Sequence, residues 1–381
     1  MKSKIANLLT YCFGDLFSIR HGYGFKGEYF TNSGSYILLT PGNFYDEGGF
    51  KHKGDKEKYY VGEIPEGFVL QEGDLIVAMT EQMDGLLGSS AIVPASNKYL
   101  HNQRLGLIVD IKDNLLDKKF LYYLFNTSVV RNQIKASASG TKVKHTSPSR
   151  IYEVKVNIPP VSAQRKIADV LSAYDDLIAV NTRRIRILEQ MAQSVYREWF
   201  GKVNGRSLPE GWKVGRLDDA LVLQRGFDLP KQDRREGDVP IYASTGITGT
   251  HIEAKVKGPG VVTGRSGSLG TVIYIEEDFW PLNTTLWVKE FRRVTPLYAY
   301  YLLKELGFSQ FNSGVAVPTL NRNDVHSLPV IIPSKEILSK FDDFVLPLYG
   351  LRRALTLKNA NLRRTRDLLL PRLVSGEVMV P

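Results

Sequence analysis

The hydrophobic pattern divides the 381-residue chain into two kinds of segment, and each kind occurs twice. Short apolar runs bounded by glycine and proline, which are typical of β-strands, fill the regions around 12–161 and 212–334. Examples of such runs are 74–78, 91–93, 271–275 and 328–332. Within these two lobes, 118–131 and 296–306 have the pattern of single helices. The sequence therefore predicts two lobes of mixed strand and helix, in the α+β class.

Each lobe is followed by a long segment of helical periodicity, at 162–200 and at 335–373. Ser162 is the predicted N-cap of the first helix, because its hydroxyl can accept a hydrogen bond from the helix backbone. Apolar residues then recur at the a and d positions of successive heptads, which predicts a coiled-coil seam. The predicted seam comprises Ile167, Val170, Tyr174, Leu177, Asn181, Leu188, Met191 and Val195, with breaks at Asn181 and Arg184, then Phe341, Phe344, Leu348, Leu351, Leu355, Leu362 and Leu369.

An internal repeat relates the two halves of the chain. Ser139-Gly140 and Ser313-Gly314 are 174 residues apart, and each is followed 18 residues later by an Ile-Pro pair. The same offset relates Lys166 to Lys340, Asp169 to Asp343, Leu188 to Leu362 and Val195 to Leu369. Upstream the offset drifts, so that Tyr122-Tyr123-Leu124 matches Tyr300-Tyr301-Leu302 and Leu87-Gly88 matches Leu269-Gly270. Ordered matches of this kind indicate two copies of one ancestral unit.

Duplication suggests how the two long helices meet. Two similar helices that follow two similar lobes would pair antiparallel, which predicts two pseudo-repeated lobes separated by a long antiparallel two-helix coiled coil. Pro347 conflicts with the second helix, because an interior proline removes a backbone hydrogen bond. The alternative is that each helix packs only on its own lobe. The resulting division is a first lobe at 1–161, its helix at 162–200, a linker at 201–211, a second lobe at 212–334, its helix at 335–373 and a tail at 374–381.

Composition and charge narrow the class of protein. Apolar residues make up 43% of the chain, which is typical of a folded globular protein. The net charge of +10 favours a polyanionic partner. Each lobe carries little of that charge, +3 from 19 basic and 16 acidic side chains in 1–161 and +2 from 16 and 14 in 201–334. Tight DNA binding would therefore need charges from a partner as well.

Cysteine usage and the apolar runs indicate the compartment. The single cysteine, Cys12, excludes an intramolecular disulfide and suits a reducing cytosol. The apolar stretch within 1–17 is interrupted by polar residues and lacks a cleavage signal, and no run approaches the ~18 apolar residues of a membrane span. We therefore expect a cytoplasmic protein with no membrane contact.

The search for catalytic motifs is negative. Asn157-Ile158-Pro159-Pro160-Val161 lacks the polar residue and the aromatic ring of an amino-methyltransferase motif, and 264–270 lacks the Lys-Ser/Thr ending of a phosphate loop. Glu153-Val154-Lys155 has no Pro-Asp pair to complete a nuclease motif. The six histidines show no metal-ligand spacing with one another or with Cys12. We therefore expect no catalytic residue and no metal site in this chain.

Three motifs resemble the specificity (S) subunits of type I restriction–modification enzymes. Ile158-Pro159-Pro160 with 164–168, Leu171-Ser172 and Asp175 resembles their central conserved region. The segment 208–212 (LPEGW) resembles the start of their second recognition domain, and 369–377 their conserved C-terminal end. The first lobe lacks the Pro-Glu-Gly-Trp opening, and 337–340 replaces a glutamine-containing stretch. That departure leaves open whether the two helices bind partners equally.

The resemblance covers essentially the whole chain and implies a function. Each lobe would be a target recognition domain that reads one half of a bipartite site in double-stranded DNA. Two modification (methyltransferase) subunits would dock on the chain and restriction subunits would join them, with S-adenosylmethionine, ATP and Mg²⁺ on those partners. This chain would itself be a non-catalytic subunit of the deoxyribonuclease and adenine methyltransferase complex. Contacts with the modification subunits are expected from the two helices at Gln164, Arg165, Ile167, Leu171, Phe341, Leu348 and Leu369.

Candidate DNA contacts are Arg, Lys, Asn, Ser and His residues in glycine-rich or polar turns, because such side chains read base edges or bind phosphates. In the first lobe these are Lys26, Arg104, Lys142, Lys144 and His145, with Lys51 and Lys53 as further phosphate candidates. In the second lobe they are Arg225 beside Gly226, Arg265, Ser266, Asn283 and Arg322. The alternatives are a coiled-coil scaffold or an RNA-binding module without sequence-specific DNA recognition, and a self-contained methyltransferase or nuclease.

The helices should act as a ruler for the spacer between the two half-sites. At 1.5 Å per residue, about 39 residues span roughly 58 Å, enough to hold two lobes one DNA turn apart. Deleting one heptad from each helix in register keeps the seam but shortens it by about 10 Å, or three base pairs at ~3.4 Å each. We expect the shortened protein to select a spacer one to three base pairs shorter, with both half-site sequences retained. If a folded, active mutant selects the original spacer length, the helices do not set the distance between the half-sites.

Overall fold

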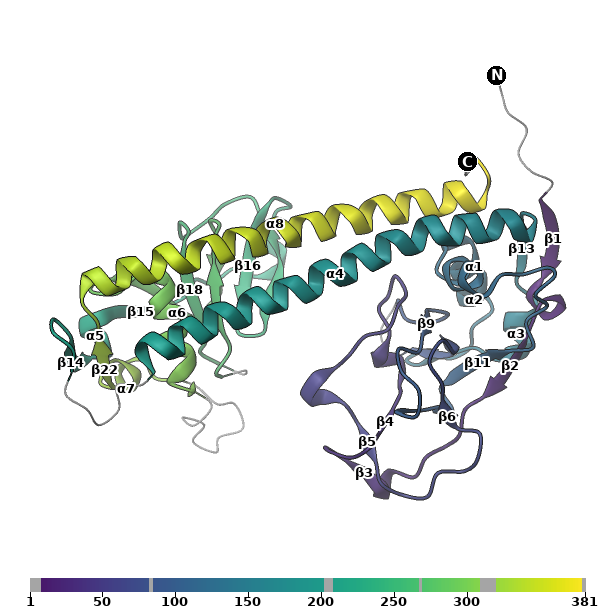
Figure 1. The fold of residues 1–381 in the computed structure, drawn as a ribbon, viewed down its shortest axis with the longest axis horizontal. Coiled ribbons are helices and arrows are strands. Elements are labelled where there is room, and N and C mark those ends of the chain that lie inside the picture. Colours follow the sequence, from purple (N-terminus) through teal and green to yellow (C-terminus); the bar gives the residue numbers. More distant parts are fainter. Residues whose placement is uncertain (1–7, 82–84, 202–207, 267–268, 309–319, 379–381) are drawn as a thin grey trace. The chain divides into compact units, whose positions relative to one another are not determined.

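The computed structural model describes residues 8–81, 85–201, 208–266, 269–308 and 320–378. The chain forms two compact units, of which unit 1 comprises Met1–Val180 with Asn359–Pro381, and unit 2 comprises Asn181–Lys358. Figure 1 shows that each unit combines sheets with part of two long helices, labelled α4 and α8. Ser313-Gly314 of the sequence repeat, most of the predicted linker and residues 267–268 lie outside the described residues.

A four-stranded antiparallel sheet organises unit 1, with the order β2-β11-β7-β9. Its strands are β2 (Ser18–His21), β11 (Leu105–Val109), β7 (Leu75–Ala78) and β9 (Ser90–Ile92). A second sheet has the order β3 (Phe30–Thr31), β5 (Tyr59–Tyr60), β4 (Tyr36–Leu38), β10 (Tyr99–Leu100) and β6 (Val69–Leu70). Two strand pairs, β1 (Leu9–Cys12) with β13 (Lys155–Ile158) and β8 (Thr80–Glu81) with β12 (Lys144–His145), complete the strands. The helices of this lobe are α1 (Lys118–Phe125), α2 (Ser128–Ala136) and α3 (Pro148–Tyr152).

Unit 2 repeats this plan. Its four-stranded sheet has the order β15 (Leu221–Arg225), β21 (Thr285–Phe291), β18 (Gly260–Gly264) and β19 (Val272–Ile275). A three-stranded sheet has the order β17 (Gly246–His251), β16 (Val239–Ala243) and β20 (Trp280–Pro281), and β14 (Lys213–Arg216) pairs with β22 (Pro329–Ile332). The helices of this lobe are α5 (Leu217–Ala220), α6 (Pro296–Glu305) and α7 (Arg322–His326).

The two lobes share hydrogen bonds as well as strand order, which confirms the duplication. The backbone N–H of Ile19 donates to Tyr152 Oη at 2.8 Å, and that of Leu223 donates to His326 Nε2 at 2.9 Å. The equivalent aromatic acceptors Tyr152 and His326 are 174 residues apart, the offset found in the sequence. Gly88 and Gly270, which the sequence comparison aligned, both have positive φ angles, 76° and 87°. A left-handed backbone of this kind favours glycine, so the motif survives for a conformational reason.

The long helices α4 (Val161–Phe200) and α8 (Lys335–Val374) pair antiparallel in each unit. In unit 1 Arg366 binds Asp175, and Asn359 Nδ2 donates to the carbonyl of Ile178 at 3.3 Å. In unit 2 Arg352 Nη1 lies 3.5 Å from Glu189 Oε1, and the rings of Phe200 and Phe341 are 5.2 Å apart. In both units the residue numbers of the contacting pairs increase along α4 and decrease along α8, so the antiparallel arrangement is confirmed.

The two helices also pack on the lobes, and each helix contributes to the cores of both units, so the alternative in which each helix packs only on its own lobe is wrong. Ile167 and Leu171 of α4 belong to the core of unit 1 together with Leu370 and Leu373 of α8. In unit 2 the core includes Ala192, Tyr196 and Phe200 of α4 and Phe341, Val345 and Tyr349 of α8. Each helix pair therefore shares one hydrophobic core with the lobe beneath it.

The predicted seam is only partly correct. Leu177 and Met191 are 37% and 45% exposed, whereas Ile178 and Ala192 beside them are buried. Phe344 and Leu351 are each 52% exposed, and Val345 is buried in place of Phe344. Apolar residues occupy neighbouring positions on these helices, so sequence spacing alone cannot decide which row faces inward. Ile167, Leu188, Phe341 and Leu355 are buried as expected, and Asn181, a polar break in the heptad pattern, is buried as well.

Two local predictions about helices are wrong, whereas the second long helix forms as predicted despite its proline. α4 begins at Val161, so Ser162 lies inside the helix, and the carbonyl of Pro160 accepts the first hydrogen bond from Ala163 at 2.8 Å. The segment 118–131 forms parts of two helices, because α1 ends at Phe125 with Asn126 as its C-cap, and Thr127 then accepts from the backbone of Val130 as the N-cap of α2. α8 runs through Pro347 without interruption.

Within the described residues, no helix is long and apolar enough to cross a membrane.

Candidate nucleic-acid interface

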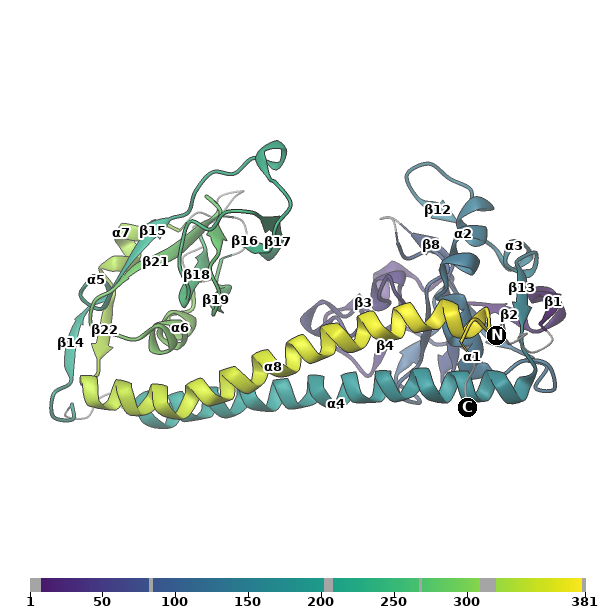
Figure 2. The same cartoon turned by 90° about the horizontal axis from the view of Figure 1, so that it is seen from above.

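Four segments of unit 1 meet at one end of the four-stranded sheet, and we call them edge 1. They are 21–23 at the end of β2, 102–104 before β11, 79–81 after β7 and 144–146 at β12. Backbone hydrogen bonds join them in a row. Gln103 N donates to Tyr23 O at 2.9 Å, Met79 N to Arg104 O at 3.0 Å, and Thr146 N to Met79 O at 2.9 Å. Figure 2 shows β8 and β12 of this edge projecting away from the part of α4 in unit 1.

Unit 2 contains the same construction, which we call edge 2. Its segments are 225–227 after β15, 282–284 before β21, 265–266 after β18 and 320–322 at the start of α7. Phe227 N donates to Pro281 O at 2.8 Å, as Tyr23 N donates to His101 O at 2.9 Å in unit 1. Arg265 N donates to Thr284 O at 2.9 Å, and Leu320 N to Arg265 O at 2.8 Å. Three backbone hydrogen bonds of edge 1 thus have counterparts on edge 2, which makes the two edges equivalent in construction.

A glycine makes each edge possible. Gly22 N donates to Leu105 O at 3.3 Å, and Gly226 N donates to Thr285 O at 3.0 Å. A Cβ atom added to Gly22 would overlap the backbone carbonyl of Asn102, and one added to Gly226 would overlap that of Leu282. Only glycine permits this close backbone approach.

The five predicted DNA contacts of the second lobe all lie on edge 2. Arg225 and Arg322 are exposed, and Arg265, Ser266 and Asn283 are half-buried. Asp228 joins two of them, because its Oδ1 lies 3.6 Å from Arg225 Nη2 and accepts a hydrogen bond from Asn283 Nδ2. Arg265 Nη1 donates to the carbonyl of Asn283 at 3.4 Å. The structure thus brings together residues that are as much as 97 positions apart in the sequence, from 225 to 322.

The predicted contacts of the first lobe lie on or next to edge 1. Arg104 and His145 are exposed on the edge, and Lys26 and Lys142 are exposed two or three residues beyond its segments. Lys144 Nζ lies 3.7 Å from Glu81 Oε1, so part of its charge is balanced within the lobe. His145 Nδ1 lies 3.2 Å from Thr80 Oγ1, a hydrogen bond that links β12 to β8.

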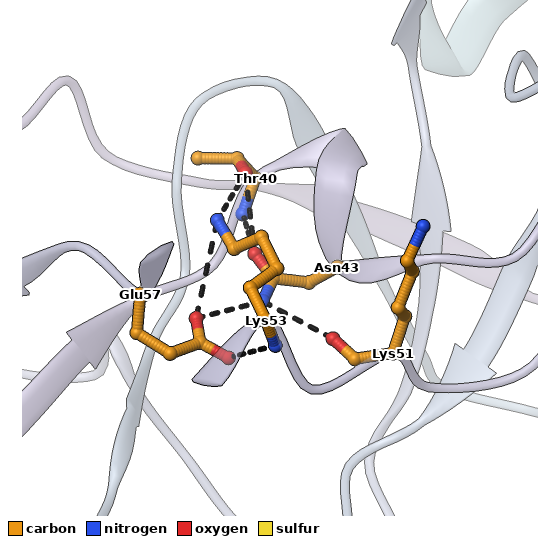
Figure 3. A network of polar contacts seen from close by, with 5 residues as sticks. All are labelled: Thr40, Asn43, Lys51, Lys53 and Glu57. Carbon is orange, nitrogen blue, oxygen red and sulfur yellow. Dashed lines mark hydrogen bonds and ion pairs between the residues drawn. The ribbon is translucent and has the colours of Figure 1, made fainter. Parts of the chain in front are cut away.

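Lys53, a predicted phosphate contact, is instead part of a polar network inside unit 1 (Figure 3). Its Nζ lies 3.3 Å from Thr40 Oγ1 and 3.9 Å from Glu57 Oε2, and its backbone N–H donates to Glu57 Oε1 at 2.6 Å. Burial lowers the pKa of Lys53, and the nearby carboxylate of Glu57 opposes that shift. Lys51 points away from this network, with its Nζ 5.6 Å from the ring centre of Tyr45.

Four of the predicted partner contacts are occupied within the chain, which corrects their assignment. Gln164 is fully buried and bonds to three backbone groups: its Oε1 accepts from Asp117 at 2.9 Å, and its Nε2 donates to the carbonyls of Leu115 and Pro159 at 2.8 Å each. Ile167, Leu171 and Phe341 are buried in the two cores, and Leu348 and Leu369 are half-buried against them. Arg165 remains exposed, with its Nε 3.8 Å from Asp117 Oδ2.

A cavity of about 700 Å³ in unit 1 lies between α1, α4 and α8, and Tyr123, Asp175 and Arg366 are part of its lining. Asp175 on its wall accepts from Tyr123 Oη at 2.7 Å and binds Arg366. Burial raises the pKa of Tyr123, and the charge of Asp175 raises it further. A tyrosine and an arginine that both satisfy one carboxylate form a structural link between α1, α4 and α8. Among the residues that the structure describes, no three His, Cys, Asp or Glu side chains gather as metal ligands would.

Sequence reasoning missed Gln103, Tyr23 and His21 of edge 1. Gln103 is next to the predicted Arg104, and its equivalent on edge 2 is the predicted Asn283. The signal that links the two is the repeat, but its offset at this turn is 180 rather than 174 because the loops differ in length. The strand register was needed to align them.

The duplicated fold and its two equivalent edges define a two-lobed nucleic-acid-binding protein. Comparison with known families agrees: the model of the type I restriction modification DNA specificity domain matches residues 8–190 and 209–349. The chain therefore belongs to the specificity subunits of type I restriction–modification systems and carries two copies of their recognition domain.

Individual relatives support this assignment. The chain is 27% identical over 325 residues to the type I restriction enzyme MjaIX specificity subunit of Methanocaldococcus jannaschii, covering 75% of this chain and 74% of the relative. It is 25% identical to the EcoBI specificity subunit of Escherichia coli, covering 84% and 74%. A crystal structure of the S subunit from M. genitalium has the same fold, with a TM-score of 0.61, 18% identity and 98% coverage of both chains.

Replacing Gln164 should destabilise unit 1. The change Gln164→Leu leaves the Asp117 N–H and two carbonyls without their partner, and buried groups left unpaired cost about 1–3 kcal/mol each. We expect the free energy of unfolding to fall by about 3 kcal/mol in denaturant titrations. The matched control is the exposed neighbour, Arg165→Leu, whose ion pair should contribute less than about 1 kcal/mol. Normal stability of Gln164→Leu combined with lost partner binding would instead restore Gln164 as a direct contact.

Proposed function

We propose that this chain is the non-catalytic subunit that reads a bipartite site in double-stranded DNA, one lobe to each half-site. The observation that carries the proposal is the equivalence of edges 1 and 2, each of which gathers cationic and polar side chains from four separate segments. Two copies of one reading surface in one chain fit a target with two half-sites separated by unread bases.

The modest charge of each lobe fits a role within a larger complex. Net charges of +3 and +2 would provide few phosphate contacts, and affinity for DNA rises with the number of phosphates neutralised. We propose that two modification subunits and the restriction subunits supply the remaining charge, together with S-adenosylmethionine, ATP, Mg²⁺ and all of the chemistry. The complex would act in the cytoplasm, where its DNA substrate is found.

The exposed apolar side chains of the long helices are the surfaces that we propose for the modification subunits. Leu177 and Val180 of α4 in unit 1 are 37% and 48% exposed, and Phe344 and Leu351 of α8 in unit 2 are each 52% exposed. Leu177 and Leu351 are 174 residues apart and therefore equivalent in the repeat. Equivalent apolar patches, one in each unit, suit two copies of the same partner.

Reading of DNA by edge 2 can be tested with a randomised duplex library. The full chain, purified with its modification subunits, should enrich a motif with two half-sites. A bidentate arginine contact to guanine contributes about 1–3 kcal/mol, so Arg265→Ala or Arg322→Ala should relax one position of one half-site. The other half-site should stay unchanged.

The matched control is Arg197→Ala, an exposed arginine on α4 of the same unit. A uniform loss of affinity with a smaller salt dependence would make Arg265 or Arg322 a phosphate contact. If the complex with the unsubstituted chain enriches no sequence from the duplex library, the scaffold alternative is favoured, and tighter binding of single-stranded RNA in a separate assay would favour the RNA-binding alternative. Methyl transfer to DNA by the chain alone would show that it is an enzyme.

The docking surfaces can be tested by charge substitution. Leu177→Glu and Leu351→Glu place a carboxylate in an apolar patch, and we expect each to weaken capture of the modification subunit by tenfold or more, on the order of 1.4 kcal/mol. Both residues are exposed, so thermal stability should hardly change. Val61→Glu and Val214→Glu, at positions 60% and 67% exposed on the lobes, are the controls. Undiminished capture by the double variant Leu177→Glu/Leu351→Glu would exclude these patches.

A further inference from the structure

The two edges carry an amide side chain at the same position, Gln103 on edge 1 and Asn283 on edge 2. The backbone bridges Tyr23 to Asn102 and Phe227 to Leu282 place both amides one residue after equivalent bridges. The carbonyls of the residues that follow, Arg104 and Thr284, accept from Met79 N at 3.0 Å and Arg265 N at 2.9 Å. The backbone therefore holds Gln103 and Asn283 in the same place.

At other equivalent positions, edge 1 and edge 2 carry side chains of different chemistry. His21 on edge 1 corresponds to Arg225 on edge 2, and Met79 corresponds to Arg265. Thr80 and Ser266 share a hydroxyl, but a hydroxyl contacts any base or a phosphate and so discriminates weakly. Among these pairs the amide is the shared group that can distinguish one base from the others.

The surroundings of each amide leave it available for a ligand. Gln103 is exposed and lies over Gly24, where an added Cβ would come within 2.9 Å of its Oε1. A side chain at position 24 would therefore displace the amide. Asn283 donates from Nδ2 to Asp228, and because a carboxylate can only accept, the amide nitrogen must face Asp228. This bond fixes the orientation of the amide, and Arg225 Nη2 lies 3.6 Å from the same oxygen of Asp228.

An amide presents a hydrogen-bond acceptor and a donor side by side. Adenine presents the complementary pair in the major groove, N6–H as donor and N7 as acceptor, and the other bases do not. We infer that Gln103 and Asn283 each read an adenine, one in each half-site, by paired hydrogen bonds. The inference rests on the proposed function and adds to it the base and the residues that recognise it.

The test uses the full chain with its modification subunits and the same randomised duplex library. Gln103→Ala should remove the preference for adenine at one position of one half-site, and Asn283→Ala should do so in the other. The preference lost should be about 5- to 150-fold. Gln71→Ala in unit 1 and Gln190→Ala in unit 2 are matched controls, because both are exposed amides away from the edges.

A base analogue distinguishes a direct contact from a structural role. A duplex with 7-deazaadenine at the position relaxed by Gln103→Ala lacks the N7 acceptor. The complex with the unsubstituted chain should therefore bind it more weakly than it binds the normal duplex. Gln103→Ala should bind both duplexes equally. Should Gln103→Ala fail to fold, Gln103→Glu keeps the size of the side chain but replaces the N–H donor with an acceptor, and it should lose the adenine preference likewise.

The outcomes separate this inference from the proposed function. If the complex with the unsubstituted chain enriches no bipartite motif, the proposed function is overturned. A bipartite motif that is unchanged by Gln103→Ala and Asn283→Ala, or relaxed by them at a position other than adenine, would overturn the amide assignment alone. Equal weakening on every sequence would also overturn it, because a phosphate contact or a loss of fold gives that result.

Discussion

Close approach of backbone to backbone at Gly22 and Gly226 is the constraint on which both candidate interfaces depend. Gly22 lets the chain after β2 lie against the turn before β11, and Gly226 lets the chain after β15 lie against the turn before β21. The hydrogen bonds that follow from this contact position Gln103 and Arg104 in unit 1, and Asn283 and Thr284 in unit 2. Since these bonds use only backbone atoms, the side chains at the same positions can vary without disturbing the fold.

This separation of scaffold from side chains explains how one duplicated fold can present two different surfaces. Unit 1 has a histidine at the end of β2, where unit 2 has Arg225 at the end of β15. Unit 1 also contains the segment around Asn43 and Glu57, whose Nδ2 and Oε2 are 3.0 Å apart. That bond is buried and binds Lys53 into the lobe, so a lysine in a glycine-rich loop becomes structural. Position in the fold decides which cations can reach a ligand.

The fold class and the duplication could be predicted from the sequence, because the strand, helix and repeat patterns are visible in it. The gathering of the candidate residues on two edges follows only from the strand pairing of the structure. Strand patterns at 271–275 and 328–332 were correct to within one residue, since β-rich runs with flanking glycine or proline have few alternatives. The burial of the predicted partner contacts could not be foreseen in this way. Gln164, Ile167 and Leu171 belong to the motif that resembles the central conserved region of the family. In this structure their side chains pack and form backbone hydrogen bonds inside unit 1. Gln103 was missed because loop lengths shift the offset of the repeat, and only the strand pairing restores it.

The long helices show why a correct heptad pattern gave a partly wrong seam. A helix that packs on a lobe, on a second helix and on a partner subunit needs apolar residues on more than one face. In unit 1 Ile178 is buried while Leu177 beside it is 37% exposed, and in unit 2 Val345 is buried while Phe344 is 52% exposed. Exposed leucine and phenylalanine at regular positions are unfavourable in water unless a further surface covers them. The residues that misled the seam prediction are the ones that we propose as contacts for the modification subunits, because the fold of each unit leaves them exposed.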